Sequence, residues 1–150
     1  MNEFHSKNFT LAEFLKSNKA EKNNINNGAY VTPDNVVAIA NLVTNVLQPV
    51  RDKLGFPMTI TSGYRSPALN RLVGGEATSQ HLKGEAADIQ CFTKKEFDVK
   101  KTRALFAALA EMDVDQLLYE RDSNGTIWVH VSYVSPAKNR HMIRDNYLAK

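Results

Sequence analysis

Residues 114–120 and 126–133 form two stretches in which apolar and polar side chains alternate, and the dipeptide Asn124-Gly125 lies between them. Alternation with a period of two predicts β-strands that bury one face, and Asn-Gly between such strands is a strong hairpin signal. The apolar side chains of the second strand then point into a core, whereas His130 points to the opposite face. We therefore expect an antiparallel sheet that carries a histidine on the side away from the core.

Helical patterns precede this hairpin. Thr10 with Glu13 forms a capping box at the start of a first helix, and the Asn-rich stretch 23–28 is expected to be a loop. Thr32 is a candidate N-cap of the longest helix, in which apolar residues recur on one face. Pro49 lies inside that pattern and predicts a kink, because the proline ring clashes with the preceding turn.

The rest of the pattern completes an α+β domain. A second capping box, Thr93 with Glu96, predicts the start of another helix, one that buries Phe97. Further short strands are expected at 58–62 and 86–90, and residues 139–146 are a candidate for a last edge strand. Helices packed on a small, mainly antiparallel sheet define the α+β class.

Composition bounds the kind of protein. The 150 residues are 43% hydrophobic and 23% charged, which fits one domain over residues 1–150 with a flexible leader at 1–8. We expect no membrane partner, since the chain has no apolar run of ~20 residues and no secretory signal. Cys91 is the single cysteine, so an internal disulfide is excluded. The net charge of +3 is mild and scattered, which predicts no nucleic-acid partner, and no exposed apolar stripe indicates more than a monomer.

Three features have the residue types of a metal site. They are the segment His81-x-x-Gly84-x-Ala86-x-Asp88, the strand residue His130, and Glu120 at the end of the preceding strand. Two imidazoles and one carboxylate are the ligands of a catalytic zinc ion, which keeps a fourth position for water. A histidine and an aspartate seven residues apart also occur by chance, so these residues alone leave a metal-free domain open.

Short motifs around these residues follow one another in a recognisable order. They are Ser62-Gly-Tyr-Arg-Ser66, Leu69-Asn70, Gly74-Gly75, Ser79-Gln-His81, Gly84-Glu-Ala-Ala-Asp-Ile89 and Trp128-Val-His-Val-Ser132. In order and spacing they resemble the zinc D-Ala-D-Ala carboxypeptidases, within the group that also holds lysostaphin-type peptidases and hedgehog domains. The resemblance covers about residues 9–145 and implies that group's fold.

The resemblance also implies roles for particular residues. His81, Asp88 and His130 match the family's ligands for one zinc ion. Arg65 matches an arginine that holds the substrate peptide or its terminal carboxylate, for which a planar guanidinium is suited. The alternative for Arg65 is a loop-fixing ion pair, and one arginine can do both.

At the position of one branch's glutamate, a candidate general base, this chain departs from part of the family. In some branches a glutamate stands three residues before the last zinc histidine, and here that position is Ile127. Glu120 is the best replacement, since Tyr119-Glu120 resembles a Tyr-Glu pair of hedgehog domains. Glu120 flanks His130 only if the hairpin loop holds an odd number of residues, because an even loop turns its side chain to the other face.

Other residues have weaker indications. Ser79 and Gln80 are expected to orient His81 or to touch substrate, because zinc histidines usually need an outer acceptor. His141 is a candidate for oxyanion stabilisation, although an exposed edge histidine is the simpler interpretation. Cys91 is expected to be a small buried hydrophobe.

The implied activity is zinc-dependent hydrolysis of peptidoglycan stem peptides, as a D,D-carboxypeptidase or an endopeptidase. Without a secretory signal, an endolysin-like protein of phage or prophage type is expected, held in the cytoplasm until it is released to the cell wall. A virion-associated wall peptidase is a close alternative. From another class, a domain that keeps zinc but only binds a peptide or the wall remains open, because of the departure at Ile127.

Overall fold

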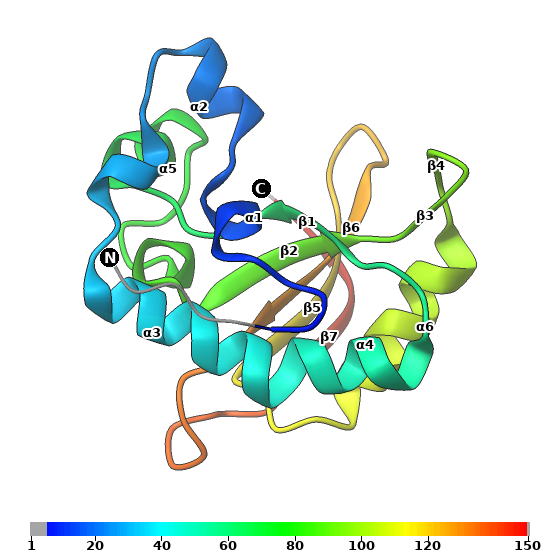
Figure 1. The fold of residues 1–150 in the computed structure, drawn as a ribbon. Coiled ribbons are helices and arrows are strands. Elements are labelled where there is room, and N and C mark those ends of the chain that lie inside the picture. Colours follow the sequence, from blue (N-terminus) through cyan, green and yellow to red (C-terminus); the bar gives the residue numbers. More distant parts are fainter. Residues whose placement is uncertain (1–5, 150) are drawn as a thin grey trace.

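The computed structural model describes residues 6–149 and is built on one five-stranded sheet in the order β1-β2-β6-β5-β7 (Figure 1). The strands are β1 (Thr59–Ser62), β2 (Ala86–Gln90), β5 (Gln116–Arg121), β6 (Ile127–Ser132) and β7 (Met142–Leu148). The long helices are α3 (Pro33–Leu42), α4 (Gln48–Leu54) and α6 (Val99–Ala110). Shorter elements are α1 (Leu11–Leu15), α2 (Asn18–Lys22), α5 (Pro67–Leu72), the 3₁₀ turns η1 (Asn27–Tyr30) and η3 (Gln80–Lys83), and the small strands β3 (Phe92–Thr93) and β4 (Glu96–Phe97). The α+β class expected from the sequence is confirmed.

The hairpin of β5 and β6 is the centre of the sheet. Arg121 pairs with Ile127, and the Asp122 N–H donates to the Thr126 carbonyl at 3.0 Å. Three residues are left in the loop, and Gly125 takes the left-handed φ of 82° that such a loop requires. The loop is therefore odd, which puts Glu120 on the same face as His130.

The last strand is present but pairs in an unexpected direction. Strand β7 runs parallel to β5, with Gln116 opposite Met142 and Leu118 opposite Arg144. The chain reverses after β6 and returns on the far side of β5, which is itself antiparallel to β6. The sheet is thus mainly antiparallel with one parallel edge pair.

Near Pro49, where the sequence predicts a kink, the helix contains a wider π turn. A π-helical segment, η2 (Val43–Leu47), joins α3 to α4 without a break in the chain's helical course. Proline offers no N–H to the helix and its ring crowds the previous turn, so a π turn just before it relieves both problems. Gly55 ends α4 with φ 77°.

The predicted capping box at Thr93 and Glu96 is wrong. These residues pair across β3 and β4, while Lys94 and Lys95 form the turn with φ of 52° and 68°. Helix α6 instead starts after Asp98, whose carboxylate accepts the Lys101 N–H at 2.9 Å. Phe97 consequently lies on the small hairpin with 37% of its surface exposed, and the prediction that it is buried is also wrong.

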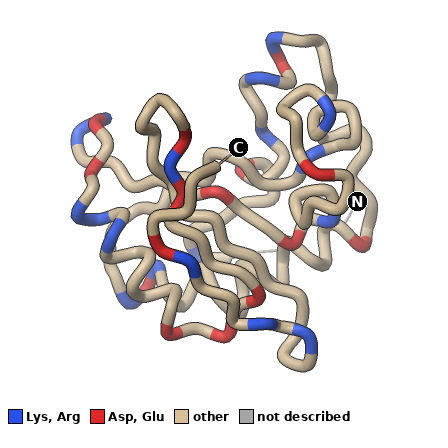
Figure 2. The backbone as a smooth tube through the Cα atoms, turned by 180° about the vertical axis from the view of Figure 1, so that it is seen from behind, with Lys and Arg blue, Asp and Glu red and all other residues tan. Residues whose placement is uncertain are grey.

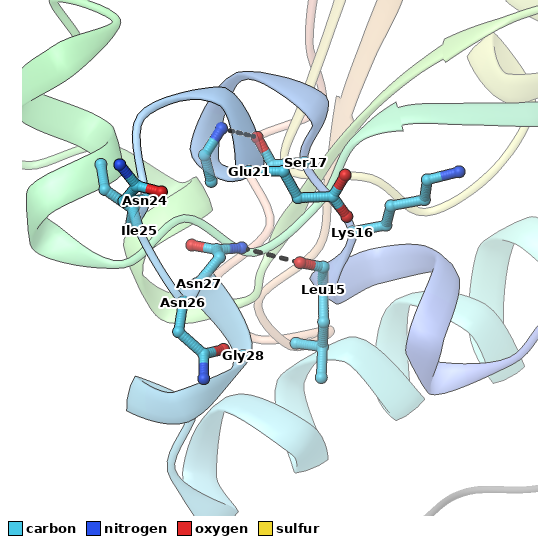
Figure 3. Close-up of a pocket in the computed structure, with 10 residues that line it drawn as sticks. Leu15, Lys16, Ser17, Glu21, Asn24, Ile25, Asn26, Asn27 and Gly28 are labelled. Atoms are coloured by element: carbon cyan, nitrogen blue, oxygen red, sulfur yellow. Dashed lines mark hydrogen bonds between the residues drawn. The ribbon is translucent and has the colours of Figure 1, made fainter.

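The expected loop at 23–28 is only partly a loop, because α2 precedes it and η1 begins inside it. Asn27 is buried at 4% exposure, and its amide N–H groups donate to the carbonyls of Leu15 and Tyr64 at 3.0 and 2.9 Å. Figure 3 shows its amide turned toward Leu15. The Asn27 oxygen accepts the N–H of Ser66 at 2.7 Å. This side chain therefore ties α1 to the turn that carries Arg65.

The chain near its start is attached to α4. Ser6 Oγ and the Asn8 N–H both donate to the Gln48 side-chain oxygen, at 2.6 and 3.0 Å. Of the expected flexible leader at 1–8, residues 1–5, with His5, lie outside the described residues. The first capping box is confirmed, since Glu13 accepts the Thr10 N–H at 2.6 Å.

Two surface properties are relevant to partners. Within residues 6–149, none of the helices combines the length and the apolar character that a bilayer crossing demands. Basic and acidic residues are interspersed along the visible backbone in Figure 2. The small positive excess is therefore distributed rather than gathered in one stripe.

Candidate metal centre

The sheet and one short turn bring three metal-binding groups together. Asp88 on β2 lies directly opposite His130 on β6, so their side chains share a face of the sheet. His81 arrives from the 3₁₀ turn η3, just before β2. The three offer one ligand atom each within 4.8 Å of one another, and all three residues are buried.

The separations are short enough for the three groups to share one cation. Asp88 Oδ2 lies 3.5 Å from His81 Nε2, and Asp88 Oδ1 lies 3.0 Å from His130 Nδ1. Ligand atoms about 2.0–2.2 Å from a zinc ion stand about 3.4 Å apart in a tetrahedron. Burial lowers the pKa of His81, which favours the neutral ring that a metal requires. Burial alone would raise the pKa of Asp88, but His81 and His130 outweigh it, so this pKa is lowered and the carboxylate is charged.

Gly63 holds the His81 ring in position. Its carbonyl oxygen lies 2.7 Å from His81 Nδ1, which therefore acts as the N–H donor and leaves Nε2 facing Asp88. A Cβ on Gly63 would come within 2.6 Å of the Phe14 carbonyl oxygen, so glycine is needed where β1 leaves the sheet. Nothing in the residue pattern indicated this role for Gly63, although it lies inside the Ser62–Ser66 motif.

Gly84 shapes the turn after His81. It has φ 81°, and a Cβ there would lie 2.6 Å from the Asn35 carbonyl oxygen. Both facts explain a glycine between the metal-binding turn and β2. The backbone therefore turns tightly at this position.

Glu120 stands beside the three candidate ligands. It pairs across the hairpin with Trp128, the residue two before His130 on the same face. Its Oε1 lies 4.0 Å from His130 Nδ1. Burial, followed by the negative charge of Asp88, raises the pKa of Glu120 above its ordinary value. The arrangement fits a group that exchanges a proton near the ligands.

Arg65 borders the centre on another side. Its Nη2 lies 3.7 Å from Asp88 Oδ2, and its Nη1 donates to Asn70 Oδ1 at 3.3 Å. The Arg65 N–H also donates to the His81 carbonyl at 3.0 Å. Burial lowers the pKa of Arg65, but the guanidinium stays charged beside Asp88. The structure thus places this arginine both on a loop contact and at the edge of the ligand cluster.

Ser79 and Gln80 lie next to His81 but do not contact its ring nitrogens. Ser79 Oγ accepts the backbone N–H of His81 at 3.2 Å. The Gln80 amide donates to Asp115 Oδ2 at 3.0 Å. The ring acceptor is the carbonyl of Gly63 instead, and contact of Ser79 and Gln80 with substrate stays a prediction.

Three other residues lie away from the ligand cluster. His141 is exposed with φ 51°, and its N–H donates to the Val114 carbonyl. Tyr119 points to the opposite face, where its ring lies 3.8 Å from the Arg103 guanidinium carbon. Cys91 is fully buried, as expected, and burial raises the pKa of its thiol to about 11.

The sequence is similar to that of a known protein and matches a family model. A zinc D-Ala-D-Ala carboxypeptidase of Streptomyces albus G is 35% identical over 83 residues, which cover 55% of this chain and 31% of that protein. This chain therefore matches about a third of that relative's length. A family model described as peptidase M15 matches residues 7–132. The resemblance drawn from the motifs is confirmed, and the chain belongs to the peptidase M15 family.

Proposed function

We propose that this chain is a zinc peptidase that hydrolyses the stem peptides of peptidoglycan, next to their D-amino acids. The observation that carries the proposal is the convergence of His81, Asp88 and His130 within 4.8 Å, with Glu120 beside them. The name of the Streptomyces relative supports both zinc and a D-Ala-D-Ala substrate. When bound, zinc supplies a Lewis acid that polarises a carbonyl and lowers the pKa of a coordinated water.

The residues of the chain then have separate tasks. Glu120 accepts a proton from the attacking water, a C–O bond forms at the scissile carbonyl, and the C–N bond breaks. Glu120 returns the proton to the leaving amine, for which its raised pKa is suited. Arg65 holds a carboxylate of the peptide with its guanidinium fork, which fixes the reacting atoms in one geometry.

Mass spectrometry of digested peptidoglycan tests the proposal. Incubation with the zinc-loaded protein is expected to release D-Ala if the protein is a carboxypeptidase, or to split cross-linked peptides if it is an endopeptidase. A chelator abolishes either product, and zinc restores it. A zinc-loaded protein that binds muropeptides without cutting them would contradict the proposal and favour the non-catalytic binding domain.

An endolysin-like role is part of the proposal and follows from the resemblance. We infer that the protein acts on the wall after release from the cytoplasm, and that it acts as a monomer. Purified protein added to cells with permeabilised outer layers is expected to lower their turbidity. Intact turbidity with efficient hydrolysis of isolated muropeptides would contradict the lytic role but not the peptidase.

A further inference from the structure

The motifs Leu69-Asn70 and Gly74-Gly75 supply neither a metal-binding nor a catalytic group. The structure places Asn70 and Gly75 against the guanidinium of Arg65, on the side away from Asp88. An inference about these residues rests on the proposed function, because it concerns how Arg65 recognises substrate.

Asn70 presents an oxygen to Arg65 in a fixed orientation. Its side chain is on α5 and buried at 4% exposure. The amide nitrogen Nδ2 donates to the Glu76 carbonyl at 2.9 Å, so the other amide atom, Oδ1, must face Arg65 Nη1 at 3.3 Å. The start of α5 is itself fixed, because the Ser66 hydroxyl caps the helix and the Asn27 side-chain oxygen accepts the backbone N–H of Ser66.

Gly75 provides the space that this contact needs. A Cβ at position 75 would overlap Asn70 Oδ1, and would lie 2.9 Å from Asn70 Cγ and 3.0 Å from Arg65 Nη1. Gly74 has φ 72°, whereas Gly75 is outside the left-handed region, so the backbone at 75 suits any residue. Room for the Asn70 and Arg65 side chains is therefore the reason for glycine at 75.

The two terminal nitrogens of the Arg65 guanidinium face different groups, a carboxylate at Nη2 and a neutral amide at Nη1. Asp88 lies 3.7 Å from Nη2, but its oxygens also face His81 and His130. Asn70 accepts a hydrogen bond without carrying a charge, so it orients Arg65 without placing a second carboxylate against the guanidinium. A charged carboxylate in place of this amide would neutralise the arginine before substrate arrives.

We propose that Asn70 and Gly75 form a clamp that positions Arg65, and that the clamp makes the enzyme select peptides with a free carboxylate next to the scissile bond. Asn70 and Gly75 are positioning residues, since they act through Arg65. The clamp comprises the Asn70 amide and the vacant space at Gly75.

Steady-state kinetics of zinc-loaded Gly75→Ala test the clamp. The substrates are an acetylated stem-peptide mimic that ends in D-Ala-D-Ala with a free carboxylate, and the same peptide as a C-terminal amide. For the free carboxylate, KM is expected to rise at least about tenfold, since a charge-assisted contact is lost. kcat should change less than about threefold, and the amide peptide should show an unchanged KM.

Gly28→Ala is the matched control. A Cβ at Gly28 would meet only the Leu15 side chain within 4 Å, at an ordinary 3.6 Å, and neither Asn70 nor Arg65. Both peptides should keep their KM in this variant. Gly75→Ala that folds, holds zinc and keeps the wild-type KM for the free carboxylate would overturn the proposal.

Asn70→Asp decides the matter if Gly75→Ala does not fold. Its size is unchanged, but its carboxylate pairs with Arg65 and loses the donor to Glu76. KM for the free carboxylate should again rise at least about tenfold, with zinc content unchanged. An unchanged KM in this variant would also overturn the proposal.

Binding measurements test the clamp independently of the proposed hydrolysis. If the wild type cuts neither peptide, the proposed function fails, and titration calorimetry of the same zinc-loaded proteins tests the clamp independently. Wild type that binds the free carboxylate more tightly than the amide, with this preference lost in Asn70→Asp, supports the clamp. Equal binding of both peptides by the wild type contradicts it.

Discussion

Two buried aspartates in this molecule each face an arginine, and their surroundings differ. Asp115 accepts four hydrogen bonds of 2.8–3.0 Å, three from Arg140 and one from Gln80. Asp88 lies 3.7 Å from Arg65, and its closest neighbours are the two histidine nitrogens at 3.0 and 3.5 Å. Both carboxylates have a lowered pKa, Asp115 through Arg140 and Asp88 through the histidines, which outweigh its burial.

The difference distinguishes a structural carboxylate from a reactive one. The bonds of Asp115 satisfy its oxygens and join the start of β5 to the segment before β7 and to η3. Asp88 instead directs its oxygens at groups that can share a cation, and its arginine does not form a bidentate pair with it. A close arginine is therefore no sign of function by itself, whereas the hydrogen-bond saturation of the carboxylate is informative.

The largest expected effect comes from Asp88→Asn. The variant loses the charged ligand, so we expect zinc content after dialysis to fall well below one ion per chain and hydrolysis to fall at least about a thousandfold. Elemental analysis and a D-Ala release assay measure the two effects. Full zinc content in this variant would show that Asp88 is no ligand.

Glu120→Gln is expected to come next. The amide cannot accept the water proton, so kcat should fall about a hundredfold or more while zinc content is unchanged. Parallel zinc and rate measurements on the same sample distinguish this result from Asp88→Asn. Wild-type turnover in the zinc-loaded variant would exclude Glu120 as the base.

Asp115→Asn should affect stability rather than chemistry. Weakening the Arg140 pair is expected to cost about 2 kcal/mol of unfolding free energy at pH 7, with zinc bound. Because the folded-state pKa of Asp115 is lowered, its stabilisation is present above the ordinary carboxyl pKa of about 4 and is lost as the pH falls below it. Urea unfolding at pH 7 and pH 3 should show the difference from wild type shrinking in acid, and a constant difference would contradict this.

The smallest effect is expected at an exposed ion pair. Lys53 and Glu111 lie 2.7 Å apart, but their side chains are 60% and 69% exposed. Solvent and salt screen such pairs, so Lys53→Met should leave the melting temperature unchanged within error. A clear loss of stability would show that distance alone, rather than burial, decides the value of these pairs.

Local patterns predicted much of the scaffold. The alternation around Asn124-Gly125 located β5 and β6, and the N-cap candidate Thr32 located the start of α3. The capping pattern at Thr93 failed because it is equally compatible with a hairpin when the next two residues adopt left-handed backbone. Propensity of a few residues does not decide between these conformations, whereas packing of the following helix does.

The parity rule for Glu120 shows how far sequence reasoning reaches into the site. From the sequence, Glu120 could lie on either face of the sheet. The hydrogen bond from the Asp122 N–H to the Thr126 carbonyl leaves three residues in the loop, and this odd number places Glu120 on the same face as His130. Gly63, Asn70 and Gly75 lay in quoted motifs without an assigned task. Gly63 shares its motif with Arg65, whereas Asn70 and Gly75 stand in motifs without a metal-binding or catalytic residue. Their roles depend on contacts that loops and turns create, and the residue types alone do not indicate these contacts.

The sequence by itself determined which groups are available: two imidazoles, one carboxylate and an arginine, in the order and spacing of the M15 family. It also determined the strand period that turns His130 away from the core. Only the tertiary structure decided which ring nitrogen of His81 faces the centre, which aspartate is saturated, and what orients Arg65. Those outcomes depend on backbone carbonyls, side-chain amides and free space contributed by other loops and turns, and residue types do not encode their positions until the chain has packed.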